Sequence, residues 1–333
     1  MMPVEFKLCK KDKVEELINF IDKHWKQDHI FVTNRELFNW QHKSRDSYNF
    51  VLAIEDNKII GILGFIPTSQ FSDELIANNE MWLAIWKVRD DINKPGLGLL
   101  MLNFLKKKFN NPTICAVGLS EQVIPIYKAL KYEVGVLEHR AFFNQNKRNF
   151  DPISPPKGFL FKLKKSNVQF EIQEDGTNLE KCKNLFKSTP KKNPEYIAKR
   201  YLEHPVYEYK LLFFRISDEV ISILVYRIQL LENLIIARIV DVVGSNIFEE
   251  RFNYPIAEFL KKENIDYVDI VSNLSCFKDS GFIKNNENFI LPNYFEPLEF
   301  RNIDLDFAYK SNSSFLSIFK GDSDQDRPSI ITK

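Results

Sequence analysis

The chain has 333 residues, of which 44% are hydrophobic, and its 46 lysines and arginines almost balance its 45 aspartates and glutamates. This length predicts two domains, and a net charge of +1 argues against a nucleic acid or an anionic membrane as partner. Four scattered cysteines without matching histidines predict neither a disulfide framework nor a metal site, and without a signal peptide or a run of ~18 apolar residues we expect a soluble, cytoplasmic protein.

Helices and strands alternate along the first half of the chain. Residues 11–26 have the apolar spacing of an amphipathic helix, and a second helix follows Asn34, a candidate N-cap. Two β-rich runs, 50–54 and 59–66, are joined by a polar turn and predict a hairpin. The elements that follow are a strand at 81–88, a helix at 99–106, a strand at 113–119, a helix at 120–130 and a strand at 134–143.

The turn between strand 81–88 and helix 99–106 reads Asn93-Lys94-Pro95-Gly96-Leu97-Gly98. Glycines at the start of a helix leave backbone N–H groups free and aligned with the positive end of the helix dipole. Such a turn predicts a binding site for an anion, most often a phosphate.

This order of elements resembles the Gcn5-related N-acetyltransferase (GNAT) family. The acyl-CoA signature of that family is Gln or Arg, two residues, Gly, one residue, then Gly or Ala. Residues 93–98 match it except at Asn93, and residues 127–132 resemble the later Tyr-x-x-x-Gly-Phe element with Lys131 in place of glycine. Two glycines alone are a weak signal, and the order of the elements strengthens it.

The resemblance implies a set of contacts with acyl-CoA. The end of the strand would bond to the pantetheine, the glycine turn would hold the pyrophosphate, and Tyr127 would protonate the departing thiolate. A packed helix tyrosine is an equally good interpretation of Tyr127. The predicted cofactor-binding residues are Trp86, Lys87, Val88, Asn93, Lys94, Gly96, Leu97 and Gly98.

The second half repeats the order of elements after a segment with three prolines and a glycine, 150–158, which places the domain boundary between 1–150 and 151–333. Between its strand and helix, residues 244–250 lack Gly-x-Gly and end in two glutamates, which would repel a pyrophosphate. We therefore expect a mixed α/β fold with two tandem GNAT-like domains, the second degenerate. Its predicted elements are a helix at 178–187, a hairpin at 211–216 and 220–230, a strand at 234–243, a helix at 251–262 and a strand at 265–271.

The C-terminal segments 291–297, 308–310 and 321–328, together with residues 25–42 and 61–67, resemble those of a narrower group. This group is the two-domain bacterial sugar N-acyltransferases of surface-polysaccharide and O-antigen pathways. The alternative for the acidic stretch 321–328 is a solvated, disordered end. The narrower resemblance implies a dTDP-linked 3-amino-3,6-dideoxyhexose as acceptor, bound between the halves, a preferred location for small molecules. The candidate contacts are the cations Arg200, His204, Arg238, Lys310 and Arg327 and the aromatic residues Trp40, Tyr201 and Tyr294, for which core packing is the alternative.

No side chain stands out as the general base, although amide formation requires a neutral amine. His29 titrates in the useful range, and its alternative is an exposed loop histidine. Asp241 could act as the base or form a structural ion pair beside Arg238. A partly deprotonated amine with a water relay would need neither residue.

Two other functions compete with acyl transfer from acyl-CoA. A FemABX-type peptidoglycan aminoacyltransferase also pairs two such folds, but the Gly-x-Gly turn and the low net charge argue against a tRNA substrate. A non-catalytic CoA- or nucleotide-sugar-binding module would bind without consuming a thioester. The sequence leaves the acyl chain open, from acetyl to a hydroxyacyl group such as 3-hydroxybutanoyl.

Overall fold

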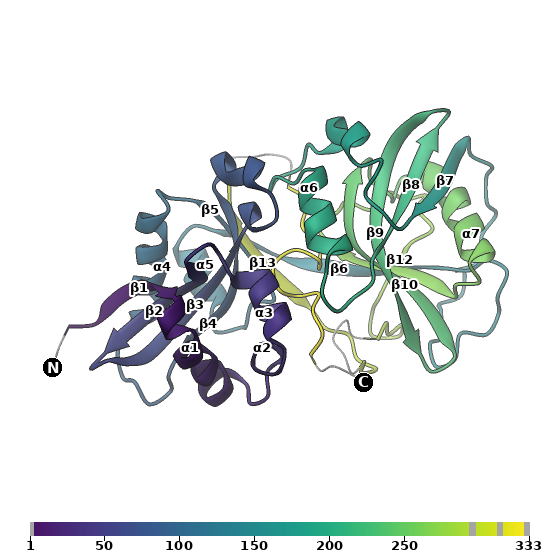
Figure 1. The fold of residues 1–333 in the computed structure, drawn as a ribbon. Coiled ribbons are helices and arrows are strands. Elements are labelled where there is room, and N and C mark those ends of the chain that lie inside the picture. Colours follow the sequence, from purple (N-terminus) through teal and green to yellow (C-terminus); the bar gives the residue numbers. More distant parts are fainter. Residues whose placement is uncertain (1–2, 293–297, 312–315, 330–333) are drawn as a thin grey trace.

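The computed structural model describes residues 3–292, 298–311 and 316–329. Figure 1 shows two α/β halves joined by one continuous sheet, whose strand order is β1-β2-β3-β4-β5-β13-β6-β11-β10-β9-β8-β7, with β12 paired to β6. The prediction of a mixed α/β fold is confirmed. No helix in these ranges is long and apolar enough to cross a membrane.

The predicted elements of the first half are present, and β1 is an addition that the sequence did not suggest. Asn34 caps α3 as predicted, since its Oδ1 accepts from the Leu37 N–H at 2.9 Å. The elements are β1 (Glu5–Lys10), α1 (Val14–Phe20), α2 (Ile30–Thr33), α3 (Arg35–His42), β2 (Ser47–Glu55), β3 (Lys58–Pro67), β4 (Glu80–Val88), α4 (Leu97–Lys108), β5 (Thr113–Val117), α5 (Ile124–Ala129) and β6 (Glu133–Phe143).

The second half also follows the predicted order, but residues 178–187 contain only a 3-10 turn at Glu180–Leu185 and no regular α-helix. Strands β7 and β13 were not predicted. The elements are β7 (Val168–Gln173), α6 (Pro194–Ile197), β8 (Lys210–Ile216), β9 (Glu219–Leu231), β10 (Leu234–Gly244), α7 (Asn253–Lys262), β11 (Tyr267–Ser272), β12 (Ile283–Lys284) and β13 (Leu305–Lys310).

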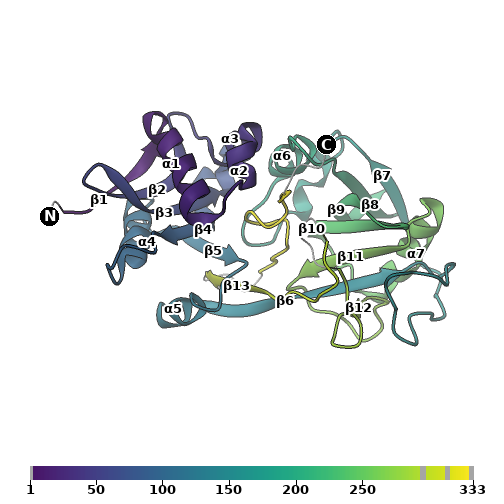
Figure 2. The same ribbon diagram turned by 90° about the horizontal axis from the view of Figure 1, so that it is seen from below.

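Two strands join the halves. The first part of β6, residues 133–137, pairs with β13, and its remaining residues pair with β11 of the second half. Strand β13 comes from near the C-terminus and lies between β5 and β6, so the chain returns to the first half. Figure 2 shows β6 running from one half into the other. The division at 150/151 stays a prediction about folding units, because the strands of the two halves share one sheet.

The helices cover both faces of the sheet. In the first half, α1, α2 and α3 pack on one face and α4 on the other, each over its own apolar cluster. A third cluster lies between the halves and contains Trp82 and Cys115 from the first and Tyr196 and Tyr201 from the second. Ile318 of the C-terminal segment belongs to this cluster and is fully buried.

The C-terminal segment, residues 316–329, runs between the two halves (Figure 1, yellow). Lys320 and Asp322 are fully buried, and Asp324 and Asp326 are 5% and 3% exposed. The interpretation of residues 321–328 as a solvated end is therefore wrong. Charged groups are buried only where other polar groups compensate them, so this segment must meet partners in both halves.

Candidate functional site

Strands β4 and β5 separate halfway along their length. They pair in parallel only where residues 80–83 face residues 113–116, whereas β4 stays paired with β3 as far as Val88. The register of β3 and β4 shifts between Leu63 and Phe65, which leaves one extra residue in β4 at this point. On the side of the gap, residues 84–88 therefore have no strand partner among the described residues. Their peptide groups can bond to an extended ligand.

The glycine turn lies beside this gap. Gly96 precedes α4 with φ of 82°, and a Cβ there would meet no atom within 4 Å. Gly98 has a packing reason, because a Cβ on it would lie 3.0 Å from Nε1 of Trp86. The first turn of α4 thus approaches β4 closely, with the positive end of a 12-residue helix beside the strand edge.

Cations around the turn already have carboxylate partners. Lys94 Nζ lies 2.6 Å from Glu55, Lys87 Nζ lies 2.6 Å from Asp90, and Arg89 pairs with Asp91. Asp90 and Asp91 are exposed, so these are weak surface pairs that an anionic ligand can displace. The side chain of Asn93 is exposed and has no hydrogen bond among the described residues.

Tyr127 of α5 packs beside the end of β4. Its ring lies 6.2 Å from the ring of Trp86, in an edge-to-face arrangement, and the side chain is 2% exposed. Burial raises the pKa of Tyr127, so its phenol stays protonated at neutral pH. A protonated phenol beside the end of β4 suits proton donation, and the catalytic role of Tyr127 stays a prediction.

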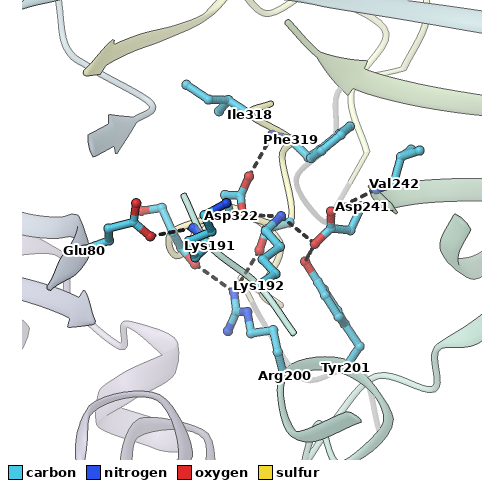
Figure 3. Close-up of polar contacts among 12 residues, drawn as sticks. Glu80, Lys191, Lys192, Arg200, Tyr201, Asp241, Val242, Ile318, Phe319 and Asp322 are labelled. Carbon is cyan, nitrogen blue, oxygen red and sulfur yellow. Dashed lines mark hydrogen bonds and ion pairs between the residues drawn. The ribbon is translucent and has the colours of Figure 1, made fainter. Parts of the chain in front are cut away.

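Asp241 belongs to a buried ionic cluster between the halves (Figure 3). Lys192 Nζ lies 2.7 Å from Oδ2 of Asp241 and 2.8 Å from Oδ1 of Asp322, and the Tyr201 hydroxyl donates to Asp241 at 2.8 Å. The structural ion pair that was the alternative for Asp241 is present, and its cation is Lys192, whereas Arg238 lies 3.5 Å from Asp269. The sequence around Asp241 could not show that its partner would be Lys192, which comes just before α6.

The structure brings Trp40, Arg200 and His204 together at the same interface. Arg200 lies over the Trp40 ring at 4.9 Å, and the His204 ring packs edge-on to Trp40 at 4.5 Å. The Arg200 guanidinium donates to the backbone oxygens of Gly321 at 3.1 Å and Ser323 at 2.7 Å. These side chains hold the C-terminal segment, and their part in acceptor binding stays a prediction.

The remaining predicted residues that the structure describes each make contacts of their own within the protein. His29 caps α2 through Nδ1, which accepts from the Phe31 N–H at 3.2 Å, and burial lowers the pKa of His29 to about 2. Arg327 lies 3.5 Å from Asp324. Lys310 donates to the Leu130 oxygen at 3.2 Å. Tyr294 lies outside the described residues.

The second half contains a counterpart of the gap, and the C-terminal segment fills it. Strand β10 pairs in parallel with β11 over residues 236–239 and then continues to Gly244 paired with β9 only. Gly321 N donates to Val240 O at 3.0 Å and Lys320 N to Val271 O at 3.1 Å, which joins the segment to both strands. The edge that is open in the first half is therefore occupied here by the protein's own backbone.

A cavity of about 600 Å³ lies beyond this segment, at the carboxyl ends of β10 and β11. Apolar side chains such as Val242 and Phe319 form part of its wall. Side-chain amides and hydroxyls supply much of the remainder: Asn184, Ser188, Ser245, Asn246, Asn273, Ser275 and Ser317. Lys187 and Glu249 add one positive and one negative side chain to the lining. Such a lining fits a polar ligand with several hydrogen-bonding atoms.

Sequence reasoning missed most of the buried charges. Lys192 follows an ordinary loop, and nothing around it in the sequence suggests a buried lysine. The C-terminal segment carried a weak signal, since Ile318, Lys320, Asp322, Asp324 and Asp326 stand at alternate positions. No group of three metal-binding side chains occurs in the described part of the chain.

The chain resembles known proteins in structure rather than in sequence. No protein-family model matches the sequence, and no curated protein matches it. Among solved structures, a Gcn5-related N-acetyltransferase from Anabaena variabilis matches 92% of this chain and 72% of its own, with a TM-score of 0.56 and 12% identity. One from Kribbella flavida matches 92% and 70%, with a TM-score of 0.52 and 9% identity.

A third solved structure is a GCN5-related glucosamine N-acetyltransferase region of a fungal multi-domain β-N-acetylglucosaminidase. It matches 93% of this chain and 38% of its own, with a TM-score of 0.52 and 12% identity. The chain therefore has the fold of the Gcn5-related N-acetyltransferases, and the likeness extends over both halves. At identities of 9–12% these matches establish the fold alone.

Proposed function

We propose that the protein is an acyl-CoA-dependent N-acyltransferase whose first half holds the acyl donor. The observation that carries this proposal is the open edge of β4, residues 84–88, which lies beside the glycine turn and the first turn of α4. The edge supplies peptide groups for the pantetheine, and the N–H groups at the start of α4 supply donors for the pyrophosphate.

The chemistry is direct attack of an amine on the thioester. The N–C bond forms as the C–S bond breaks, and Tyr127 holds the proton that the departing thiolate takes up. Peptide N–H groups along the open edge of β4 are the donors nearest to the developing oxyanion. No acyl-enzyme is required, since one attack completes the transfer.

The acceptor that we propose is a nucleotide-linked amino sugar of the dTDP-3-amino-3,6-dideoxyhexose type, acylated for surface-polysaccharide biosynthesis in the cytoplasm. The narrower sequence resemblance supports this proposal. The fungal structure with the same fold is described as a glucosamine N-acetyltransferase, another enzyme for an amino sugar.

Release of free thiol tests the proposal directly. The protein should liberate thiol from acetyl-CoA or 3-hydroxybutanoyl-CoA when a panel of nucleotide-linked amino sugars is offered, and mass spectrometry should find the acylated sugar. Binding of both ligands without thiol release would indicate a non-catalytic module. A gel shift with aminoacyl-tRNA would instead favour aminoacyl transfer.

A pair of variants at Gly96 tests where the donor binds. Asp and Asn both tolerate the left-handed conformation, and a Cβ at Gly96 meets open space, so Gly96→Asp and Gly96→Asn differ mainly in charge. A carboxylate about 4 Å from a phosphate costs about 1 kcal/mol at the dielectric constant of water and about 4 kcal/mol at an effective value of 20. Calorimetry should therefore show about 5- to 1000-fold weaker acyl-CoA binding for Gly96→Asp than for Gly96→Asn. Equal affinities would place the pyrophosphate elsewhere.

A further inference from the structure

The C-terminal segment reaches the mouth of the gap between β4 and β5. Ser323 Oγ donates to the backbone oxygen of Leu83 at 2.9 Å, and Leu83 is the last residue of β4 that pairs with β5. The Gln325 side chain lies against Gly118, which follows β5 directly; a Cβ on this glycine would fall 2.6 Å from Gln325 Oε1. Residues 323–325 therefore touch both strands where they part.

In the sequence, Asp324 stands between Ser323 and Gln325, which make these two contacts. Its Oδ1 accepts from Gln325 Nε2 at 2.9 Å and from Ser323 Oγ at 3.4 Å, and Oδ2 lies 3.5 Å from Arg327 Nε. The residue is 5% exposed. Its carboxylate is thus held in place by neighbours on its own segment and has one long ionic contact.

The other acids of the segment are more tightly engaged. Asp322 lies 2.8 Å from Lys192 and accepts from the Phe319 N–H at 2.9 Å. Asp326 accepts from the Tyr209 hydroxyl at 2.6 Å and from Arg227 at 3.3 Å. A carboxylate that must accept a proton cannot be fully committed to a buried ammonium or guanidinium. Asp324 meets this requirement best within the segment.

We propose that Asp324 is the general base for the acceptor amine, an inference that rests on the proposed acyltransferase function. Asp324 takes one proton from the ammonium form of the amine, directly or through one water, and the neutral nitrogen then attacks the thioester carbonyl. The C–S bond breaks as the amide forms, and Tyr127 gives its proton to the thiolate sulfur. The nitrogen loses its second proton as it becomes the amide nitrogen, and this proton restores the Tyr127 phenol through solvent. The proton taken by Asp324 is lost to solvent, so one proton is released for each acyl group transferred.

The two bases suggested by the sequence fit this step less well. His29 Nδ1 is occupied as a helix cap, and burial lowers the pKa of His29 to about 2, which makes it a poor proton acceptor near neutrality. Asp241 lies in the buried ionic cluster with Lys192. Asp306 is an acid close to Gly118, and its backbone oxygen accepts from the Gly118 N–H at 2.8 Å.

The experiment compares Asp324→Asn, Asp324→Glu and the neighbouring control Asp306→Asn in the full chain, with thiol release measured against pH. For an ordinary amino sugar, Asp324→Asn should lower kcat about 10²- to 10⁴-fold and leave the Kd for acyl-CoA unchanged, because general bases contribute rate enhancements of this size. The acidic limb of the kcat/KM profile should shift toward the pKa of the amine. Asp324→Glu should keep more activity than Asp324→Asn, and Asp306→Asn should resemble the wild type.

A second acceptor makes the test specific for proton removal. An amine acceptor whose pKa is lowered below 6 by neighbouring fluorines is already neutral at pH 7, so Asp324→Asn should slow its acylation far less. Equal losses for both amines, or wild-type kcat with the ordinary amine, would overturn the role of Asp324. Loss of activity in Asp306→Asn alone would move the base to that residue. Absence of thiol release by the wild-type protein would instead refute the proposed function itself.

Discussion

Three largely buried histidines predict that the protein loses stability in mild acid. Burial is the main cause that lowers the pKa of His29 to about 2 and the pKa values of His42 and His204 to about 3. The same side chains have a pKa of about 6.5 in an unfolded chain. Below pH 6.5 the unfolded chain therefore binds protons that the folded protein does not, and the folded state is penalised as the pH falls.

The size of this effect follows from the number of protons. Between pH 6 and 4 the unfolded chain binds about three more protons at the histidines, whereas burial raises the pKa of Asp322 to about 6 and gives the folded state about one more. The difference of about two protons corresponds to about 3 kcal/mol of unfolding free energy lost per pH unit. Lys320, whose pKa burial lowers well below its ordinary value, acts in the same direction as the histidines.

Urea unfolding at pH 7, 6, 5 and 4, followed by tryptophan fluorescence, measures this slope. His204→Asn is the matched variant, because Nδ1 of His204 accepts from the N–H groups of Val206 and Tyr207 and an asparagine oxygen can replace it without titrating. The variant should reduce the slope by about one proton, or about 1.4 kcal/mol per pH unit. An unfolding free energy that stays constant from pH 7 to pH 4 would refute the burial of neutral histidines.

Two further variants separate catalysis from assembly. Tyr127→Phe should lower turnover about 10²-fold or more with unchanged acyl-CoA affinity by calorimetry, since only the proton donor is lost; wild-type turnover would remove Tyr127 as the acid. Gly321→Ala should lower the melting temperature by several degrees, because its Cβ would lie 2.4 Å from Val240 O. Gly176→Ala is its control, because the nearest atoms to a Cβ there are side-chain carbons of Leu179, Leu202 and Ala198 at 3.3–3.7 Å. Equal melting temperatures for the two variants would contradict the tight fit of the segment.

Local patterns in the sequence were enough to predict most of the first half. The apolar spacing of α1, the Asn34 cap of α3 and the polar turn between the β-rich runs of β2 and β3 are all properties of short stretches, and so is the glycine turn before α4. Strand β13 has no comparable signal. Its place depends on pairing with β5 and β6, which lie more than 160 residues earlier in the chain.

The partners of the buried charged side chains could not be predicted from the sequence either. Arg200 and Arg238 are predicted contacts of an anionic acceptor, and that prediction stays untested. Their partners within the protein are carbonyls of the C-terminal segment for Arg200 and Asp269 for Arg238, and the sequence did not indicate either. A sequence shows that a cation exists and leaves its partner undetermined when the partner is distant along the chain. Asp241 illustrates this, since its lysine comes from position 192.

The two gaps in the sheet give the two copies of the fold different roles, and only the first copy has the glycine turn. In the first half the edge of β4 stays open beside Gly96, whereas in the second half the backbone of residues 318–321 takes the corresponding place between β10 and β11. The segment held there continues for two residues and bonds to Leu83 at the first gap through Ser323. We infer that the second half uses this strand edge to bind the C-terminal segment instead of a ligand, and that the bound segment positions Asp324 beside the gap that remains open.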